Sequence, residues 1–448
     1  MSNENEPHIY VSPKGSDSWT GFAPEQRGVV GLCTEGPLRT LRAAVMAARE
    51  LRRRGRTGPS VRVRLRGGRY ALNFPLELGP EDSGLCLEGA PGEDAVLDGS
   101  VLLDAPEVSK DENGELWGYD VADLLLHEGA FESLFVNGNR RVPARYPTEG
   151  HLEVTEAPER YPGYKGTGAH LNGVRRFRTD PAKLRGLGDL RGARVILMNR
   201  WLIERLTVTS WDVESGEFVF DRPTRLFLKP EAGTKRCRFF LERLSRKPTA
   251  VGSWALDGKD GRLWYRPLDG ERPGEADARV PLVCQHLRVL GNLREGRVVR
   301  GIELRNLRFH CADAAEPVNR ALWWDPYRSE SEWDRRDACR HQEISGADPR
   351  ADTGALVQAA LNVPGTVQFE AAEDCVMEDC EVAHIGFHAV AVWRGCRNLR
   401  FVGNHFHDLG AGGIIAEGTG ADGPARDHTA HLRVSDNVIE GTGHIFPA

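Results

Sequence analysis

The sequence lacks the usual marks of a membrane, zinc-binding or nucleic-acid-binding protein. No apolar run is long enough to span a bilayer. The nine cysteines are scattered and form no Cys-x-x-Cys pair, which excludes the common zinc sites of that kind. Basic residues number 59 against 65 acidic ones, and the net charge is −6. Neither nucleic acid nor an anionic membrane is therefore an expected partner.

The two ends of the sequence also lack features. The start, MSNENEPHIYVSP, has neither the basic nor the apolar region of a signal peptide. Taken literally this predicts a cytoplasmic protein, although a secreted protein whose signal had been removed would look the same. The sequence stops at Ala448 in mid-repeat with no capping element, so we expect further coils in a longer chain.

What the sequence does contain is a repeat of about two dozen residues. Between residues 374 and 418 it matches itself after a shift of 24 positions, which places Asp408 on His384 (408 − 384 = 24). A further copy covers residues 431–446, and an earlier one covers residues 301–310. Inside each copy short apolar alternations are bounded by Gly and Asn, which is typical of strands. Repeats of this length indicate stacked units that bury their apolar faces against one another.

This repeat predicts an all-β fold, a right-handed parallel β-helix in which each repeat is one coil. Thr40 is a predicted N-cap, and the apolar spacing after it predicts a capping helix over the open end of the first coils. The hairpin signals Asn137-Gly138 and Ser215-Gly216 predict an inserted antiparallel β-rich domain. The expected organisation is a cap with the first coils in 1–104, the inserted domain in 105–282, and further coils, incomplete at the C-terminus, in 283–448.

Stacking has a consequence for chemistry, because neighbouring coils lie about 4.8 Å apart. His384 and Asp408 should therefore be adjacent on the outside of the solenoid. Asp408 precedes a glycine-rich segment that would leave it facing a groove. It is a candidate general acid, base or nucleophile, or else an Asx corner that bonds its own backbone. His384 is predicted to tune this carboxylate or bind substrate, with a structural role as the alternative.

A second carboxylate is needed if the chemistry is glycoside hydrolysis. In the aligned repeats no two carboxylates occupy matching positions. We therefore expect the partner of Asp408 to come from a loop, with Glu417 as the candidate, or from coils beyond Ala448.

The candidate substrate-binding residues are aromatic and imidazole side chains. Trp323 and Trp324 lie in a long non-repetitive segment, where indole faces could pack on sugar rings or simply anchor the segment. His388 and His407 are expected near the same groove, with a packed histidine as the alternative at His388. His407 shares a strand face with His405, but a metal site there would lack a clear third ligand, so no metal is predicted.

An acidic run offers a different chemistry. As calcium ligands its carboxylates would suit a pectate-lyase-type enzyme, whereas a solvated face is the simpler interpretation. The run consists of Glu373, Asp374, Glu378 and Asp379.

Several segments, taken in order, resemble bacterial right-handed parallel β-helix proteins of carbohydrate metabolism. The carrying segments are IYVSPKGSD with PLRTLRAAVMAAR, LFVNGNRRVPARYP, DGRLWYRP, GFHAVAVWRGC and HDLGAGGI. Within this group the chain looks most like glycoside hydrolase family 141, which is known for α-L-fucosidase and xylanase activity. The resemblance implies retaining-type acid chemistry on groove carboxylates, with Asp408 as a catalytic residue and no required cofactor.

The first hypothesis is thus a glycoside hydrolase acting on a polysaccharide or oligosaccharide. A polysaccharide lyase is the first alternative, and it would need calcium or basic side chains in the groove. A non-catalytic glycan-binding β-helix is the second. Fold alone does not choose among them, and in all three the partner is a carbohydrate. The sequence leaves the sugar, the linkage and the oligomeric state open.

Overall fold

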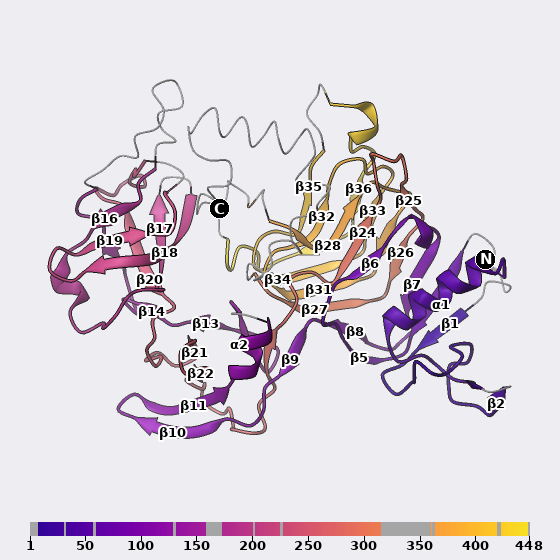
Figure 1. Cartoon of the computed structure of the whole chain (residues 1–448), viewed down its shortest axis with the longest axis horizontal. Coiled ribbons are helices and arrows are strands. Elements are labelled where there is room, and N and C mark those ends of the chain that lie inside the picture. Colours follow the sequence, from indigo (N-terminus) through magenta and orange to yellow (C-terminus); the bar gives the residue numbers. More distant parts are fainter. Residues whose placement is uncertain are drawn as a thin grey trace. The chain divides into compact units, whose positions relative to one another are not determined.

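The structure is a computed structural model in which the chain forms two compact units. The coil unit comprises residues 8–101, 280–314 and 363–445, and the hairpin unit comprises residues 102–279 (Figure 1). Among the described residues no helix is long and apolar enough to cross a bilayer. The structure describes residues 8–30, 33–56, 60–128, 131–157, 173–199, 202–224, 227–314, 360, 363–418 and 423–446.

The coil unit is built on three sheets of parallel strands, named here sheets I, II and III in the order the chain meets them. Sheet I contains β1 (His8–Val11), β4 (Val61–Leu65), β7 (Leu85–Gly89), β26 (Glu303–Arg305), β30 (Val376–Glu378), β33 (Arg400–Val402) and β36 (Arg433–Ser435). Sheet II contains β5 (Gly68–Ala71), β8 (Ala95–Asp98), β27 (Arg308–Ala312), β31 (Glu381–Ile385), β34 (His405–Leu409) and β37 (Val438–Ile439). Sheet III contains β6 (Leu76–Leu78), β24 (Leu287–Leu290), β28 (Gly365–Glu370), β32 (His388–Val392) and β35 (Ile414–Ala416).

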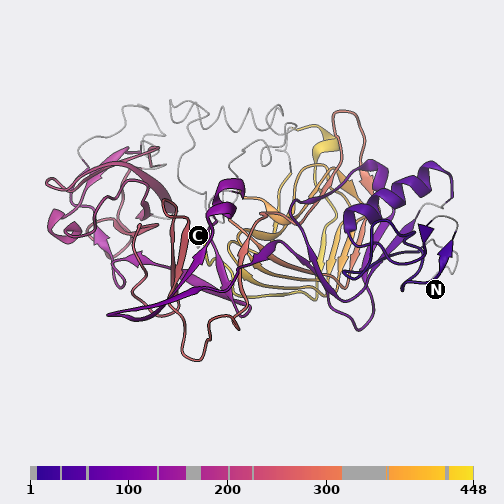
Figure 2. The ribbon, with the colours of Figure 1, turned by 60° about the horizontal axis from the view of Figure 1, so that its bottom comes forward.

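The chain visits the three sheets in rotation, so each circuit adds one strand to each sheet. Figure 2 shows the orange and yellow strands of successive circuits side by side. The register follows the sequence repeat: Val382 of β31 pairs with Phe406 of β34, which pairs in turn with Ile439 of β37. The predicted match of residues 24 apart is confirmed, and so is the prediction of a mainly β chain with stacked parallel strands.

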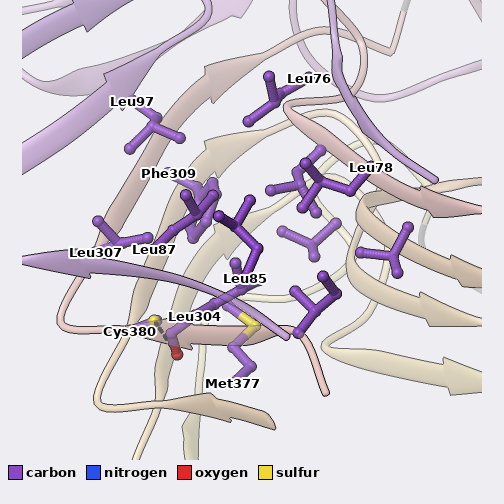
Figure 3. Close-up of a cluster of buried hydrophobic side chains, with 14 of the residues drawn as sticks. Leu76, Leu78, Leu85, Leu87, Leu97, Leu304, Leu307, Phe309, Met377 and Cys380 are labelled. Atoms are coloured by element: carbon purple, nitrogen blue, oxygen red, sulfur yellow. Dashed lines mark hydrogen bonds between the residues drawn. The ribbon is translucent and has the colours of Figure 1, made fainter. Parts of the chain in front are cut away.

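Alternate residues of these strands face inward and form one apolar core (Figure 3). Leu304, Phe309 and Val382 are each fully buried in it. Because side chains alternate between the two faces of a strand, the residues between these inward ones point outward. The core therefore fixes which polar residues of each coil share an outer face.

Helix α1 (Leu41–Arg53) packs against β1 and β4, the first strands of sheet I. The Thr40 hydroxyl accepts a hydrogen bond from the Ala43 N–H at 3.1 Å, which satisfies one of the free N–H groups at the helix start. The predicted N-cap and helix are confirmed. The apolar stripe at helical spacing is buried, namely Leu41, Ala44, Val45, Ala48 and Leu51.

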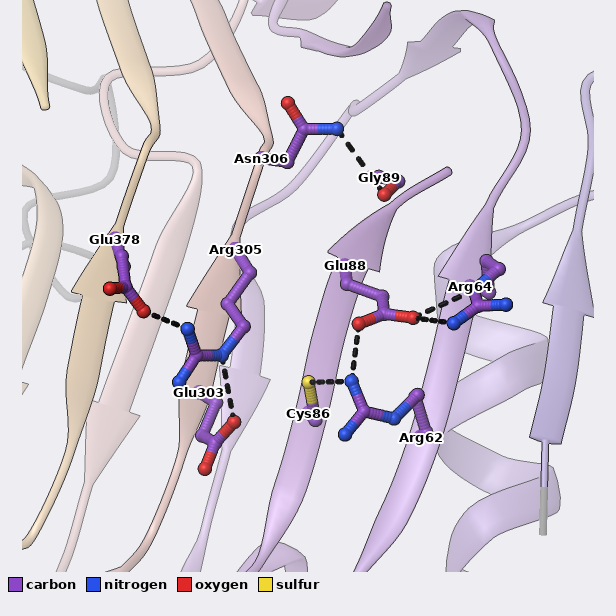
Figure 4. Close-up of polar contacts among 9 residues, drawn as sticks. All are labelled: Arg62, Arg64, Cys86, Glu88, Gly89, Glu303, Arg305, Asn306 and Glu378. Atoms are coloured by element: carbon purple, nitrogen blue, oxygen red, sulfur yellow. Dashed lines mark hydrogen bonds and ion pairs between the residues drawn. The ribbon is translucent and has the colours of Figure 1, made fainter. Parts of the chain in front are cut away.

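The outward face of sheet I carries arginine–carboxylate pairs between neighbouring coils (Figure 4). Glu88 of β7 receives hydrogen bonds from both Arg62 and Arg64 of β4. Arg305 of β26 bonds Glu303 on its own strand at 2.9 Å and pairs with Glu378 of β30. Guanidinium groups stay charged across the whole accessible pH range, so these contacts act as fixed struts along the stack.

The rotation through the three sheets is interrupted in sequence twice, each time between a strand of sheet II and a strand of sheet III. The hairpin unit lies in sequence between β8 and β24, and a second long segment lies between β27 and β28. At the first departure the Leu282 N–H donates to the Gly99 carbonyl at 2.8 Å, so exit and return touch. At the second departure the Asp313 N–H donates to the Val283 carbonyl, also at 2.8 Å.

The coil unit also contains short elements outside the three sheets. They are the two-stranded pairs β2 (Val29–Val30) with β3 (Cys33–Thr34) and β25 (Val299–Arg300) with β29 (Ala372–Glu373), and the 3₁₀ turns Pro80–Asp82 and Ala425–Asp427. The junctions between the units in sequence fall at β9 (Ser100–Leu102) and β23 (Ala278–Pro281).

The hairpin unit is mostly antiparallel. Its first sheet has the order β10 (Glu107–Asp111), β11 (Gly114–Asp120), β22 (Arg262–Tyr265), β21 (Ser253–Asp257), β13 (Asn139–Pro143), β12 (Leu134–Val136), β23 and β9. Its second sheet has the order β14 (Arg145–Tyr146), β20 (Arg238–Glu242), β17 (Arg194–Asn199), β18 (Leu202–Asp212), β19 (Glu217–Phe220) and β16 (Arg176–Arg178), with β15 (Leu152–Glu153) also on β20. Helix α2 (Ala122–Glu128) and a 3₁₀ turn (Pro181–Leu184) complete the unit.

The predicted hairpin turns lie where the sequence signals placed them. Asn137 and Gly138 join β12 to β13 with φ of 52° and 70°, the left-handed values that a two-residue turn of this type requires. Gly216, with φ of 68°, stands between β18 and β19.

Candidate active site

Sheet II carries three of the candidate residues, His384, His407 and Asp408. On β34 the side chain of Phe406 is fully buried, whereas those of His405 and His407 are partly exposed. The strand therefore presents both imidazoles on one face, as predicted, with ring centroids 4.4 Å apart. On β31 the same alternation places Glu381 outward beside the buried Val382.

A backbone feature recurs where each sheet II strand turns toward sheet III. Cys311, His384, Asp408 and Gly441 occupy matching places in four successive coils and have φ of 61°, 60°, 50° and 57°. Non-glycine residues rarely adopt this left-handed conformation. The repeated bend interrupts the strict alternation of side chains at these positions. It explains why His384 and Asp408 can face each other at the end of their strands.

His384 and Asp408 are hydrogen-bonded. The Nδ1 atom of His384 lies 2.7 Å from Oδ2 of Asp408, which is hydrogen-bonding distance. Their side chains are 16% and 17% exposed, so the pair is sheltered and still reachable from solvent. The other carboxylate oxygen of Asp408 lies 3.6 Å from Nε2 of His444. The adjacency predicted from the repeat is thus present as a direct contact.

Glu381 sits between two further histidines. Its Oε1 atom lies 2.7 Å from Nε2 of His310 on β27 and 3.5 Å from Nε2 of His407 on β34. The hydrogen bond from His310, together with the charges of His310, Arg308 and His407, lowers the pKa of Glu381 to about 2 despite its partial burial. Glu381 is therefore ionised at any working pH.

The His384 ring stands between these groups and Asp408. Its centroid lies 5.5 Å from that of His310 and 5.8 Å from that of His407, with both ring pairs edge to face. Partial burial and the neighbouring imidazole of His405 lower the pKa of His407. We call the five residues His310, Glu381, His384, His407 and Asp408 the histidine–carboxylate cluster.

One more histidine supports the cluster from the core side. His286 is fully buried, and its Nε2 atom lies 2.8 Å from the backbone carbonyl of His310. Burial lowers the pKa of His286 to about 4, so it is neutral at neutral pH. A neutral ring donating through Nε2 holds the His310 backbone in place.

The remaining predicted site residues lie elsewhere. Glu417 follows β35 at the far end of a sheet III strand, and its backbone N–H donates to the Val392 carbonyl at 2.8 Å. It is on a different sheet from Asp408. His388 opens β32 with 5% of its surface exposed, and its Nδ1 accepts a hydrogen bond from the Gly412 N–H at 3.0 Å. Trp323 and Trp324 lie outside the described residues.

The sequence analysis did not single out Glu381 or His310. In the aligned repeats Glu381 matches Arg308 and His405, so no carboxylate shares its column. Its contacts run diagonally to His310 and His407, which flank Ala383 two residues further along the strand. The usable signal was the number of histidines on the outward positions of successive strands.

In the described part of the chain no group of three or more His, Cys, Asp or Glu side chains is placed to hold a metal ion. The acidic run is engaged in other contacts. Glu373 accepts a hydrogen bond from Arg300 at 2.9 Å, and Asp374 accepts one from Asn398 at 3.0 Å. Arg305 pairs with Glu378, so arginines neutralise this surface.

Comparison with known proteins rests on structure, because no family model and no curated protein matches the sequence. A solved structure named as a glycoside hydrolase superposes with a TM-score of 0.70 at 20% identity, over 98% of this chain and 74% of that one. The chain therefore shares the fold of that protein.

More distant solved structures also match. XylC in complex with xylose gives a TM-score of 0.30 at 11% identity, over 90% of this chain and 54% of that one. A tailspike of an Acinetobacter baumannii bacteriophage in complex with capsular saccharide gives 0.14 at 10% identity, over 81% and 44%.

Proposed function

We propose that the coil unit is a right-handed parallel β-helix interrupted by an inserted antiparallel domain, and that the protein is a glycoside hydrolase. Its substrate would be a polysaccharide or oligosaccharide, and Asp408 its catalytic acid. The observation that carries this proposal is the 2.7 Å hydrogen bond between Asp408 and His384 within a sheltered cluster of titratable groups. The resemblance to glycoside hydrolase family 141 and the shared fold with a protein named as a glycoside hydrolase support it.

The chemistry follows from this hydrogen bond. Cleavage of a glycosidic bond leaves an oxygen that must be protonated as the bond breaks. A carboxyl group that is hydrogen-bonded to an imidazole can deliver a proton to that oxygen and be reloaded from solvent. His384 would act through Asp408, by holding the carboxyl group and its proton at the end of β34.

The other predicted residues enter as parts of the same proposal. Glu417 is the second carboxylate proposed from the sequence, and it lies on another sheet than Asp408. His388 and His407 are candidate sugar contacts. His388, being buried and bonded to the backbone, would act by holding the Gly412 segment. Trp323 and Trp324 are candidate stacking platforms for sugar rings.

The experiment is a screen of the full chain on 4-nitrophenyl glycosides and on plant and bacterial polysaccharides. With an active substrate in hand, Asp408→Asn should lower kcat/KM on the polysaccharide by roughly 10²–10⁴-fold. Asp374→Asn is the matched control, because Asp374 is also left-handed, with φ of 57°, and lies outside the cluster. It should keep wild-type activity.

The other outcomes are distinct. Unsaturated products, detected by their ultraviolet absorbance, would replace the hydrolase with a lyase. Glycan binding without any turnover would favour a binding protein. Equal activity of Asp408→Asn and Asp374→Asn would remove Asp408 from the mechanism.

A further inference from the structure

We propose that Glu381 is the second catalytic carboxylate, working opposite the Asp408–His384 pair as the nucleophile. This inference rests on the proposed glycoside hydrolase function and supplies the partner that the aligned repeats do not reveal. It replaces Glu417 in that role.

The position of the Glu381 carboxylate follows from its two imidazole contacts. His310 and His407 flank Ala383 on the neighbouring strands, and Glu381 reaches both of them from two residues earlier on β31. The carboxylate must therefore lie above Ala383, between the two rings. Ala383 is fully buried and has the smallest side chain that still carries a Cβ, which leaves room for the carboxylate over it.

This position sets the separation from Asp408. The level of Ala383 is one residue from the level of His384 and Asp408, and Asp408 is one strand over. A rise of about 3.3 Å and a strand spacing of about 4.8 Å put these two positions about 6 Å apart, and we infer a similar separation of the two carboxylates. Retaining glycosidases place their carboxyl pairs about 5–5.5 Å apart and inverting ones about 6.5–9.5 Å apart, so about 6 Å is within about 1 Å of the retaining range.

The two carboxylates also have opposite surroundings. Glu381 faces two imidazoles and, through His310, a hydrogen bond that favours its ionised form; its side chain is 24% exposed. Asp408 is hydrogen-bonded to Nδ1 of His384. The low pKa of Glu381 makes it a poor proton donor and a weak base, but a suitable nucleophile and leaving group. Asp408 with His384 is the proton-carrying partner.

The proposed step balances without a further reactant. A Glu381 oxygen attacks the anomeric carbon and forms a glycosyl ester, while the bond from that carbon to the leaving oxygen breaks. The leaving oxygen takes the proton from the Asp408–His384 pair. Water then attacks the same carbon, returns one proton to the pair and releases the Glu381 carboxylate. The net reaction adds one water across the glycosidic bond and retains the configuration at the anomeric carbon.

Glu440 provides a matched control on the same face. Like Glu381 it contacts an imidazole, since its Oε1 lies 2.9 Å from Nε2 of His405, but its side chain is 63% exposed and outside the cluster. Both Glu381→Gln and Glu440→Gln remove one charge and keep side-chain size. Thermal unfolding of both variants checks that each is folded.

The experiment measures kcat/KM of the full chain on two glycosides of one sugar, one with a 4-nitrophenyl and one with a methyl leaving group. Glu381→Gln should lose roughly 10³-fold on both, because attack on carbon is needed whatever leaves. Asp408→Asn should lose far more on the methyl glycoside, which needs protonation. In Glu381→Ala, added azide should restore turnover of the 4-nitrophenyl glycoside and give a glycosyl azide of inverted configuration.

A pH profile tests the imidazole contact separately. His310→Gln keeps the carboxylate but removes the imidazole that is hydrogen-bonded to it, so the acidic limb of kcat/KM should move to higher pH. A merely structural role for Glu381 would not move that limb.

The outcomes separate the two proposals. If Asp408→Asn shows its leaving-group dependence while Glu381→Gln behaves like Glu440→Gln, the role of Glu381 is overturned and the hydrolase stands. If azide fails to rescue Glu381→Ala and products form with inversion, the nucleophile assignment is overturned. If the wild-type chain hydrolyses no glycoside, the proposed function fails and this inference fails with it.

Discussion

Sheets I and II of the coil unit stack in the same way, yet their outward faces carry different chemistry. On sheet I the coils are linked by arginine–carboxylate pairs, such as Arg305 with Glu378. On sheet II they are linked by imidazole–carboxylate pairs, such as His384 with Asp408 and His310 with Glu381. Sheet II also has arginine–carboxylate pairs, such as Arg69 with Asp98, but it adds the imidazole pairs.

The difference indicates which face can do acid–base work. A guanidinium group keeps its proton at any accessible pH and cannot exchange it with a substrate. Imidazole titrates near neutrality and can donate or accept a proton as a reaction proceeds. Stacked parallel strands bring side chains of neighbouring coils together on every outward face. The residue types then decide whether a contact only stabilises the fold or can also transfer protons.

The largest expected effect comes from the core that both faces share. Phe401 of β33 backs sheet I and Phe406 of β34 backs sheet II, and both are essentially fully buried. Phe401→Ala and Phe406→Ala should each cost about 3–5 kcal/mol of unfolding free energy, since each leaves a cavity in the same core. Chemical denaturation measures both. A much smaller cost at Phe406 would mean that sheet II is a looser support, and the comparison of the two faces would break.

The next effect is a difference in pH dependence. The pKa of His286 falls from its ordinary 6.5 to about 4 on burial, so between these values the unfolded chain binds more protons than the folded one. Stability should be complete above pH 6.5 and fall by up to about 3 kcal/mol as the pH drops toward 4. Glu381 adds a second loss, because its pKa is depressed from 4.5 to about 2 and its contribution disappears over that window.

Denaturation at a series of pH values tests this dependence. His286→Gln should flatten the slope between pH 6.5 and 4 and leave the lower window in place. The arginines of sheet I do not titrate in either window. An unchanged slope in His286→Gln would show that other groups cause the acid sensitivity.

The smallest effect is expected from the sheet I pairs. Arg305 and Glu378 have side chains 33% and 29% exposed, so solvent screens much of their attraction. Arg305→Gln should cost no more than about 1 kcal/mol, and the difference from wild type should shrink in high salt. Thermal unfolding at low and high salt measures it. A larger loss of unfolding free energy that salt does not change would show that the sheet I pairs stabilise the fold as strongly as core residues do.

The sequence predicted the coil register because the repeat is explicit. Once residues 24 apart are known to be neighbours, the contact of His384 with Asp408 follows. Hairpin turns were equally accessible, because Asn137 and Gly138 carry the left-handed backbone that few other pairs adopt. These features depend on local sequence or on a fixed period.

Contacts between residues at non-matching positions of neighbouring coils could not be predicted in this way. The Glu381 side chain extends along its strand and contacts His310 and His407, which lie two positions further on in the neighbouring strands. Aligned repeats show which positions match but not the direction of a side chain. Glu417 shows the converse limit. Its place in a loop made it a candidate partner of Asp408, but the strand that precedes it, β35, belongs to another sheet than β34. Side-chain direction, and not only register, decides which polar groups meet.

The chain leaves the stack at Gly99 and rejoins it at Leu282, and one backbone hydrogen bond of 2.8 Å joins the two points. Because the two ends of the inserted segment are already in contact, an inserted segment of any length can connect them. The packing of the coils therefore does not depend on the size or shape of the inserted domain. A few flexible residues could replace the inserted domain, because the entropic cost of closing a loop depends only weakly on loop length. Gly99 and Leu282 are accordingly suitable positions for replacing the inserted domain with another one while the three sheets keep their packing.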